Sequence, residues 1–238
     1  MIDDEIFANM LLMLLCYFYI LLIIFVSSKM DKILGLRRKA SRKFLHIMIG
    51  NLPFIIPFFT SNFYPFLVAV PFIPITFLAS AYSPFKNLSN KMKGLTDITE
   101  EGHQLGLVFY AISYTVLALL FASKQYVMVL AARILPMAYG DAVASVVGEK
   151  FGKRKYGVFS EKSLEGSAAM FLASFSVLTF SLFYFSLILP FSFLDKLFHA
   201  VVVAAVTTLV EGFTPLSFDN LTVPAFGALV FFLLNGGV

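Results

Sequence analysis

The sequence predicts an all-α membrane protein, a polytopic bundle of about seven or eight transmembrane helices. Of the 238 residues, 59% are apolar and 13% are charged, whereas about a quarter of the residues in soluble domains are charged. A helix that crosses a bilayer needs about 20 residues, so spans of that length and their connections use the whole chain. A sizeable soluble domain is therefore excluded, and the net charge of +4 is too small to indicate a nucleic-acid partner.

Eight apolar runs are the candidate spans. They lie at 6–26, 44–59, 63–82, 105–122, 126–147, 167–189, 197–210 and 223–234. The second run and the last two are short for a span. Prolines are expected to kink or break the second and third helices, because proline lacks an amide hydrogen and clashes with the preceding turn. These prolines are Pro53, Pro57, Pro65, Pro71 and Pro74.

Basic residues are concentrated in three connections. Segments 29–43, 86–93 and 150–162 contain fifteen of the eighteen Lys and Arg residues. With eight spans these segments share one face of the membrane, and the positive-inside rule predicts that this face is cytoplasmic. Cys16 is the single cysteine and allows no internal disulfide.

Ionisable residues within or at the ends of apolar runs are costly and tend to mark functional sites. All of them except Arg133 fall toward the predicted cytoplasmic ends of their spans. A single one is equally well explained as an interfacial side chain that reaches water, but several at one face indicate a site at that membrane surface. They are His46, Arg133, Asp141, Glu165, Glu211 and Asp219.

The segment from Gly140 to Ser167 has the densest chemistry. Asp141 is followed by a helix face of small residues, which permits close helix packing or close approach of a ligand. A glycine-containing loop with several cations follows, and such a loop suits a triphosphate. The same loop also satisfies the positive-inside rule and can contact anionic lipid. Gly140 precedes Asp141, the small residues that follow it are Ala142, Ala144, Ser145 and Gly148, and the cations are Lys150, Lys153, Arg154 and Lys155.

The residues directly before the next span read Lys162-Ser163-Leu164-Glu165-Gly166. A serine followed by a carboxylate is typical of a helix N-cap, while a lysine beside a carboxylate can instead hold a phosphate and its magnesium. Magnesium prefers oxygen ligands, usually one or two carboxylates plus phosphate oxygens. The candidate ligands are Asp141, Glu165, Glu211 and Asp219, and their spacing does not select among them.

The first basic connection ends in Arg42 and Lys43, and His46 shares a helix face with Arg42. His46 either accepts a proton from an attacking alcohol or packs as an interfacial histidine. The chain contains neither a Walker A loop nor the motifs of protein kinases.

Four blocks in this order resemble the CTP-dependent polyprenol kinase family, which includes dolichol, phytol and archaeal geranylgeraniol-type kinases. The blocks are Arg42-Lys43-x-x-His46-x-x-x-Gly50, 100–110 with His103, 140–167, and 211–224 with its Asp219-Asn220 pair. The resemblance implies a single transmembrane catalytic domain over 1–238, with a first helix and basic connection at 1–43 and a kinase core at 44–238. It also implies transfer of the γ-phosphoryl group of CTP to the hydroxyl of a polyprenol-type membrane alcohol. A divalent cation such as Mg²⁺ would take part.

Under this resemblance Asp141, His46 and Lys162 are the expected catalytic residues, and the proton acceptor is either Asp141 or His46. Metal binding is expected from the four carboxylates. The active site is expected to face the cytoplasm, in the plasma membrane of a prokaryote or in the endoplasmic reticulum or plastid membrane of a eukaryote. The oligomeric state is open. The residues expected to bind CTP are Arg42, Lys43, Gly140, Ser145, Gly148, Lys153, Arg154, Lys155, Ser163, Gly166 and Asn220.

Two other functions also fit parts of the sequence. The end of the central block, residues 162–166, is similar to the corresponding segment of phosphatidate cytidylyltransferases. Those enzymes, however, have a different acidic signature at the position of residues 211–220. A lipid-phosphate transporter or flippase would also have broken helices and intramembrane charges. The charges here gather at one face rather than at the midplane, and no inverted halves are detectable, so the kinase is favoured.

Overall fold

The computed structural model describes residues 2–34, 38–80, 82–87, 105–122, 126–157, 161–215 and 218–236. The chain divides into two compact units, an N-terminal unit (Met1–Ser123) and a C-terminal unit (Lys124–Val238). The described residues are almost entirely helical, which confirms the predicted all-α class. The prediction of one catalytic domain over the whole chain stays a prediction.

Apolar helices occupy all eight predicted runs. Four are long and apolar enough to cross a membrane: Asp4–Met30, Val127–Phe151, Leu164–Ser186 and Phe193–Phe213. Four shorter apolar segments follow the other predicted runs: Lys43–Phe58, Phe63–Ala79, Gly106–Phe121 and Asp219–Leu234. The chain is thus a polytopic membrane protein.

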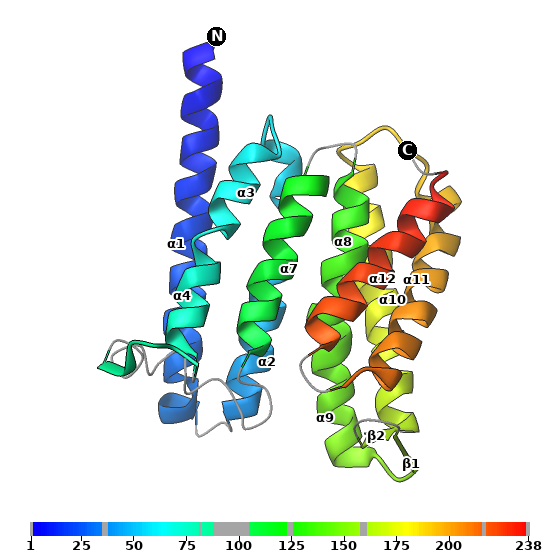
Figure 1. Cartoon of the computed structure of the whole chain (residues 1–238). Helices are drawn as coiled ribbons and strands as arrows, with labels where there is room; N and C mark the ends of the chain where they lie inside the picture. The colour runs from blue at the N-terminus through cyan, green and yellow to red at the C-terminus, as the bar shows by residue number, and fades with distance from the viewer. Residues whose placement is uncertain are drawn as a thin grey trace. The chain divides into compact units, whose positions relative to one another are not determined.

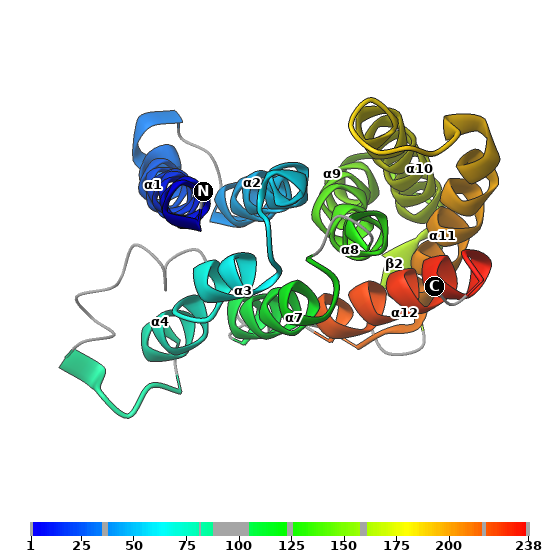
Figure 2. The ribbon, with the colours of Figure 1, turned by 90° about the horizontal axis from the view of Figure 1, so that it is seen from above.

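The N-terminal unit has two helical layers. Helix α1 packs against α2 and α3, and α7 packs against α3 and α4. Figure 2 shows α1 and α2 on one side of this unit, with α3, α4 and α7 on the other. The helices are α1 (Ile2–Leu34), α2 (Arg38–Ile49), α3 (Phe63–Ala69), α4 (Phe72–Ala79) and α7 (Gly106–Phe121).

Prolines break the second and third apolar runs, as predicted. After α2 the chain forms two 3-10 turns, Leu52–Phe54 and Ile56–Phe58, each with a proline at its start. Pro71 separates α3 from α4. Pro65 and Pro74 lie in the first turns of these two helices, where the backbone amides have no partner within the helix and a missing N–H costs little.

The C-terminal unit is a ring of helices. The continuous rod of α8 and α9 packs on α10, α10 on α11, α11 on α12, and α12 returns to α8. A two-residue antiparallel ladder between β1 and β2 joins α9 to α10 at one end of the unit (Figure 1). The elements are α8 (Val127–Leu135), α9 (Asp141–Phe151), β1 (Lys155–Tyr156), β2 (Lys162–Ser163), α10 (Leu164–Ser186), α11 (Phe193–Phe213) and α12 (Asp219–Leu234).

Two features of this unit differ from the sequence prediction. The run predicted as a short span at 197–210 belongs to a 21-residue helix, α11. Its first turn contains Asp195 and Lys196, which ended the apolar run in the sequence; in the structure the Lys196 ammonium donates to the side-chain carbonyl of Asn235. The β-hairpin between α9 and α10 was not predicted, because strands of two residues leave no alternating pattern.

Glycines bring α9 and α10 into close contact. A Cβ built on Gly166 would lie 3.1 Å from the carbonyl oxygen of Ala144 and 3.3 Å from the Cα of Gly148. A Cβ on Gly140 would collide with the hydroxyl of Ser174. The small residues of this block therefore serve helix packing.

Candidate functional site

Lys162 lies at the centre of a cluster of charged side chains in the C-terminal unit. Its ammonium donates a hydrogen bond to Glu211 Oε1 and forms an ion pair with that carboxylate. Only 21% of the Lys162 side chain and 5% of the Glu211 side chain are exposed. We call Lys162, Glu211, Asp141 and Asp219 the Lys162 cluster, because all three carboxylates act electrostatically on the ammonium.

The charges around Lys162 shift the pKa of its ammonium. Burial by itself lowers the pKa, since the charged ammonium loses water. The negative charges of Glu211, Asp141 and Asp219 outweigh burial and raise the pKa above its ordinary value of 10.5. Lys162 is therefore a fixed positive charge at neutral pH.

Helix ends position the three carboxylates. Glu211 lies in the last turn of α11, and Asp219 is the first residue of α12. A hydrogen bond of 3.0 Å between the hydroxyls of Thr214 and Thr222 ties these two ends together. Asp141 begins α9, directly after a π-helical turn over Pro136–Gly140. Proline cannot continue α-helical hydrogen bonding, and π-turns of this kind are frequent at functional sites.

The Lys162 cluster contains carboxylates, which are the type of side chain that binds divalent cations. Three ionised carboxylates and one ammonium carry a net charge of −2, and carboxylate oxygens are ligands that Mg²⁺ prefers. Within the described ranges, no group of three or more His, Cys, Asp or Glu side chains lies close enough to hold a metal. A magnesium ion here would take one or two carboxylates and complete its shell with phosphate oxygens and water, which is its usual mode.

Glu165 and Ser163 contact the backbone. Glu165 Oε2 accepts the amide hydrogens of Lys153 (3.1 Å) and Arg154 (3.3 Å). Ser163 is the N-cap of α10, and its hydroxyl accepts the amide hydrogen of Gly166 at 3.1 Å. The capping interpretation of this segment is thus confirmed for Ser163. The predicted roles of Glu165 toward metal and of Ser163 toward CTP stay predictions.

Exposed cations surround the hairpin. The side chains of Lys153, Arg154 and Lys155 are exposed, and Lys155 forms an ion pair with Glu161 at 3.4 Å. Because Glu165 binds two backbone amides at this turn, the cations project from an anchored loop. This arrangement suits a polyanionic ligand.

Tyr156 fixes the hairpin to the helices and was missed by sequence reasoning. Its hydroxyl lies 2.5 Å from the hydroxyl of Ser167 on α10. It also lies against Gly212 of α11, where a Cβ would come within 2.6 Å of the phenol oxygen. Gly212 directly follows Glu211, so Tyr156 holds the hairpin beside the Lys162 cluster. The sequence offers no periodic signal for this contact.

The other residues predicted in this unit take ordinary positions. Ser145 is half-buried on α9, and Asn220 is buried at the start of α12, where its backbone N–H donates to Asp219 Oδ1 at 2.8 Å. Gly140, Gly148 and Gly166 lie at helix contacts. The predicted roles of these residues in binding CTP stay predictions.

The N-terminal unit contains the remaining predicted residues. Lys43 and His46 are buried on α2, and the His46 ring stacks on Tyr110 with a centroid distance of 4.8 Å. Tyr110 donates a long hydrogen bond of 3.5 Å to the carbonyl oxygen of His46. The side chain of Arg42 and all of His103 lie outside the described residues. The predicted roles of these residues in phosphoryl transfer stay predictions.

Comparison with known proteins finds phytol kinases. The chain is 38% identical over 146 residues to a phytol kinase from Synechocystis sp., covering 60% of each chain. It is 30% identical over 210 residues to a probable chloroplastic phytol kinase from Triticum aestivum, covering 84% of this chain and 69% of that protein. Phytol kinase 1 from Arabidopsis thaliana is 28% identical over 216 residues, covering 84% of this chain and 68% of that protein.

The match thus spans about 60% of the cyanobacterial relative and somewhat over two thirds of the wheat protein. No protein-family model matches the chain. No solved structure matches it significantly. From the extent of the wheat alignment, this chain belongs to the polyprenol kinase family represented by these phytol kinases.

Proposed function

We propose that this protein transfers the γ-phosphoryl group of CTP to the hydroxyl of a polyprenol-type membrane alcohol of the phytol, geranylgeraniol or dolichol class. The observation that supports this most directly is the Lys162 cluster beside an anchored, cationic hairpin, in a chain of this family. The names of its relatives favour a phytol-like alcohol.

The triphosphate would bind at the hairpin. Lys153 and Arg154 present cationic side chains there, and their backbone is held by Glu165. Phosphoryl transfer depends mainly on positioning and on neutralising charge on the phosphates. An anchored loop loses less conformational freedom on binding than an unanchored one, so it suits this task.

Lys162 would act as a positioned cation on the phosphates. Its ammonium is already oriented by Glu211 and stays protonated at neutral pH, so it offers a constant positive charge to the transferred group. Asp141 or His46 would accept the proton of the attacking alcohol. Some of Asp141, Glu165, Glu211 and Asp219 would hold Mg²⁺, which when bound neutralises charge on the phosphates.

The predicted membrane orientation belongs to the same proposal. Under the positive-inside rule the hairpin faces the cytoplasm, where nucleotides are available. The membrane would be the plasma membrane in a prokaryote, and the endoplasmic reticulum or plastid membrane in a eukaryote.

The test uses the purified protein in lipid vesicles with Mg²⁺ and CTP labelled separately at the α- and γ-phosphates. Acceptors are phytol, geranylgeraniol, a dolichol, diacylglycerol and phosphatidic acid. We expect γ-label on a prenyl alcohol, and ATP in place of CTP tests the nucleotide. Alpha-label on phosphatidic acid would show a cytidylyltransferase instead, and no transfer from either nucleotide would refute the kinase.

A further inference from the structure

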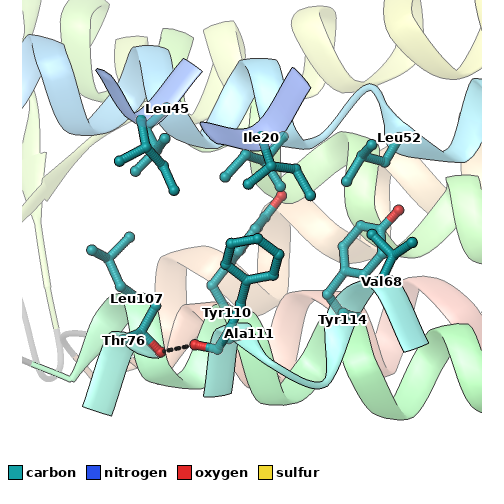
Figure 3. A pocket seen from close by; sticks show the side chains of 13 residues that line it. Ile20, Leu45, Leu52, Val68, Thr76, Leu107, Tyr110, Ala111 and Tyr114 are labelled. Carbon is teal, nitrogen blue, oxygen red and sulfur yellow. Dashed lines mark hydrogen bonds between the residues drawn. The ribbon is translucent and has the colours of Figure 1, made fainter. Parts of the chain in front are cut away.

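An apolar pocket lies inside the N-terminal unit. It is lined by residues of α1, α2, α3, α4 and α7, with Leu52 from the first 3-10 turn. In Figure 3, Leu45, Ile20 and Leu52 face Leu107, Tyr110 and Tyr114 across this space.

The pocket wall is almost wholly hydrocarbon. Three lining side chains carry a hydroxyl, and they differ in whether that hydroxyl has a hydrogen-bond partner. Thr76 donates to the carbonyl oxygen of Phe72 at 2.7 Å, and Tyr110 donates to that of His46. The hydroxyl of Tyr114 is buried and has no hydrogen-bond partner among the described residues. Figure 3 shows this hydroxyl at the end of a ring that reaches from α7 toward Leu52.

We propose that this pocket binds a branched isoprenoid alcohol, with the alcohol's hydroxyl on Tyr114 and its chain against the aliphatic wall. The inference rests on the proposed function, which requires a prenyl alcohol as acceptor, and adds where the protein takes that alcohol from the bilayer.

Hydrophobicity alone cannot select the alcohol, because the surrounding lipid tails are equally apolar. Selection within a membrane requires close packing or a polar contact. The aliphatic wall, with Ile20, Leu45 and Leu52, supplies packing for a methyl-branched chain. The Tyr114 hydroxyl supplies the polar contact, since a buried hydroxyl without a partner gains a hydrogen bond when a ligand brings one. Phospholipid acyl chains and hydrocarbons offer no such group within the tail region.

Binding can be measured by fluorescence because the chain contains no tryptophan. Phe72→Trp places a single reporter in the pocket wall, and Phe180→Trp places a control on α10, where Phe180 is 59% exposed. The quenchers are dibrominated phytol, the same branched hydrocarbon without the hydroxyl, a dibrominated straight-chain alcohol, and brominated phosphatidylcholine. All are titrated into vesicles that contain the full chain.

We expect dibrominated phytol to quench the Phe72→Trp reporter saturably, at mole fractions that leave the Phe180→Trp control almost unchanged. Tyr114→Phe in the reporter background should weaken binding of the brominated alcohol by about fivefold, the loss of one hydrogen bond. It should leave binding of the hydrocarbon unchanged. Because the Tyr114 hydroxyl has no partner, this variant should keep its thermal stability without ligand.

Equal quenching at both reporters would overturn the proposal. Preferential quenching by brominated phosphatidylcholine would show that the pocket holds an acyl chain, and equal affinity of the straight-chain alcohol would remove the selection for branching. Unchanged alcohol affinity in Tyr114→Phe would remove the hydroxyl contact. Since the assay contains no nucleotide, its failure is distinguishable from failure of phosphoryl transfer.

Discussion

Replacing Lys162 by methionine should destabilise the C-terminal unit more than replacing its partner Glu211 by glutamine. Lys162→Met leaves the Glu211 carboxylate buried, with 5% of its side chain exposed, and without the ammonium. Asp141 and Asp219 also lose the ammonium whose positive charge they attract. Glu211→Gln is milder, because Lys162 keeps the attraction of the two aspartates.

The magnitude follows from the burial of the pair. Two unit charges 4 Å apart interact by about 4 kcal/mol at an effective dielectric constant of about 20. The 21% exposure of Lys162 allows some screening by water, so we expect Lys162→Met to lower the free energy of unfolding by about 3 kcal/mol, at the lower end of the cost of breaking a buried pair. Lys162→Met/Glu211→Gln should cost less than the sum of the two single changes, by about 2 kcal/mol.

The assay is a double-mutant cycle of reversible unfolding in mixed micelles. The pair Lys155–Glu161 is the control, because its side chains are 50% and 72% exposed at a distance of 3.4 Å. Exposed pairs contribute at most about 1 kcal/mol, so Lys155→Met/Glu161→Gln should show little coupling. Equal coupling in the two cycles would refute the reasoning, since it would mean that the buried pair behaves like a surface pair.

Three further predictions concern the same unit. Asp141→Asn should lower kcat for lipid phosphorylation by at least about 100-fold without loss of folded protein. The control Asp195→Asn, on the exposed first turn of α11, should keep normal turnover. Near-normal activity of Asp141→Asn would contradict the role assigned to Asp141. Gly212→Ala should displace Tyr156 and lower the unfolding temperature, and adding Tyr156→Phe should restore part of the loss by removing the oxygen 2.6 Å from the new Cβ; no restoration would exclude this clash. The pKa of Lys162 is raised above 10.5, so the stabilising contribution of Lys162 is present below that pH and is lost as the pH rises through the raised value. The difference in unfolding free energy between wild type and Lys162→Met should therefore stay constant from about pH 7 to pH 10 and shrink above that range. Unfolding followed by circular dichroism measures this difference.

The sequence predicted the membrane helices well because their signal is strong and local. Each apolar run is continuous over many residues, and the prolines that break the second and third runs act on their own turns. The start of α11 was harder, since Asp195 and Lys196 at a helix end look like a connection in the sequence. A polar residue that reaches water from the end of a span interrupts hydropathy without interrupting the helix.

The candidate site was predictable in composition but not in pairing. Asp141, Glu165, Glu211 and Asp219 were equivalent candidates in the sequence, yet Glu165 binds the backbone of the hairpin while the others act on Lys162. Lys162 and Glu211 are 49 residues apart, and no periodicity connects residues at such a distance. The contact of Tyr156 with Gly212 was invisible for the same reason. Long-range pairs of this kind depend on how the helices pack.

The separation of 49 residues between Lys162 and Glu211 also has a meaning during synthesis. A ribosome adds about 5–20 residues each second, so Lys162 is complete for about 2 to 10 seconds before its partner carboxylate exists. Throughout that interval the ammonium before α10 lacks the Glu211 carboxylate, while the cations of the hairpin are already present. Positive charges at the end of a nascent apolar helix determine the orientation in which the helix is inserted into the membrane. The lysine can thus help to set the direction of α10 first, and become part of an ion pair only when α11 follows.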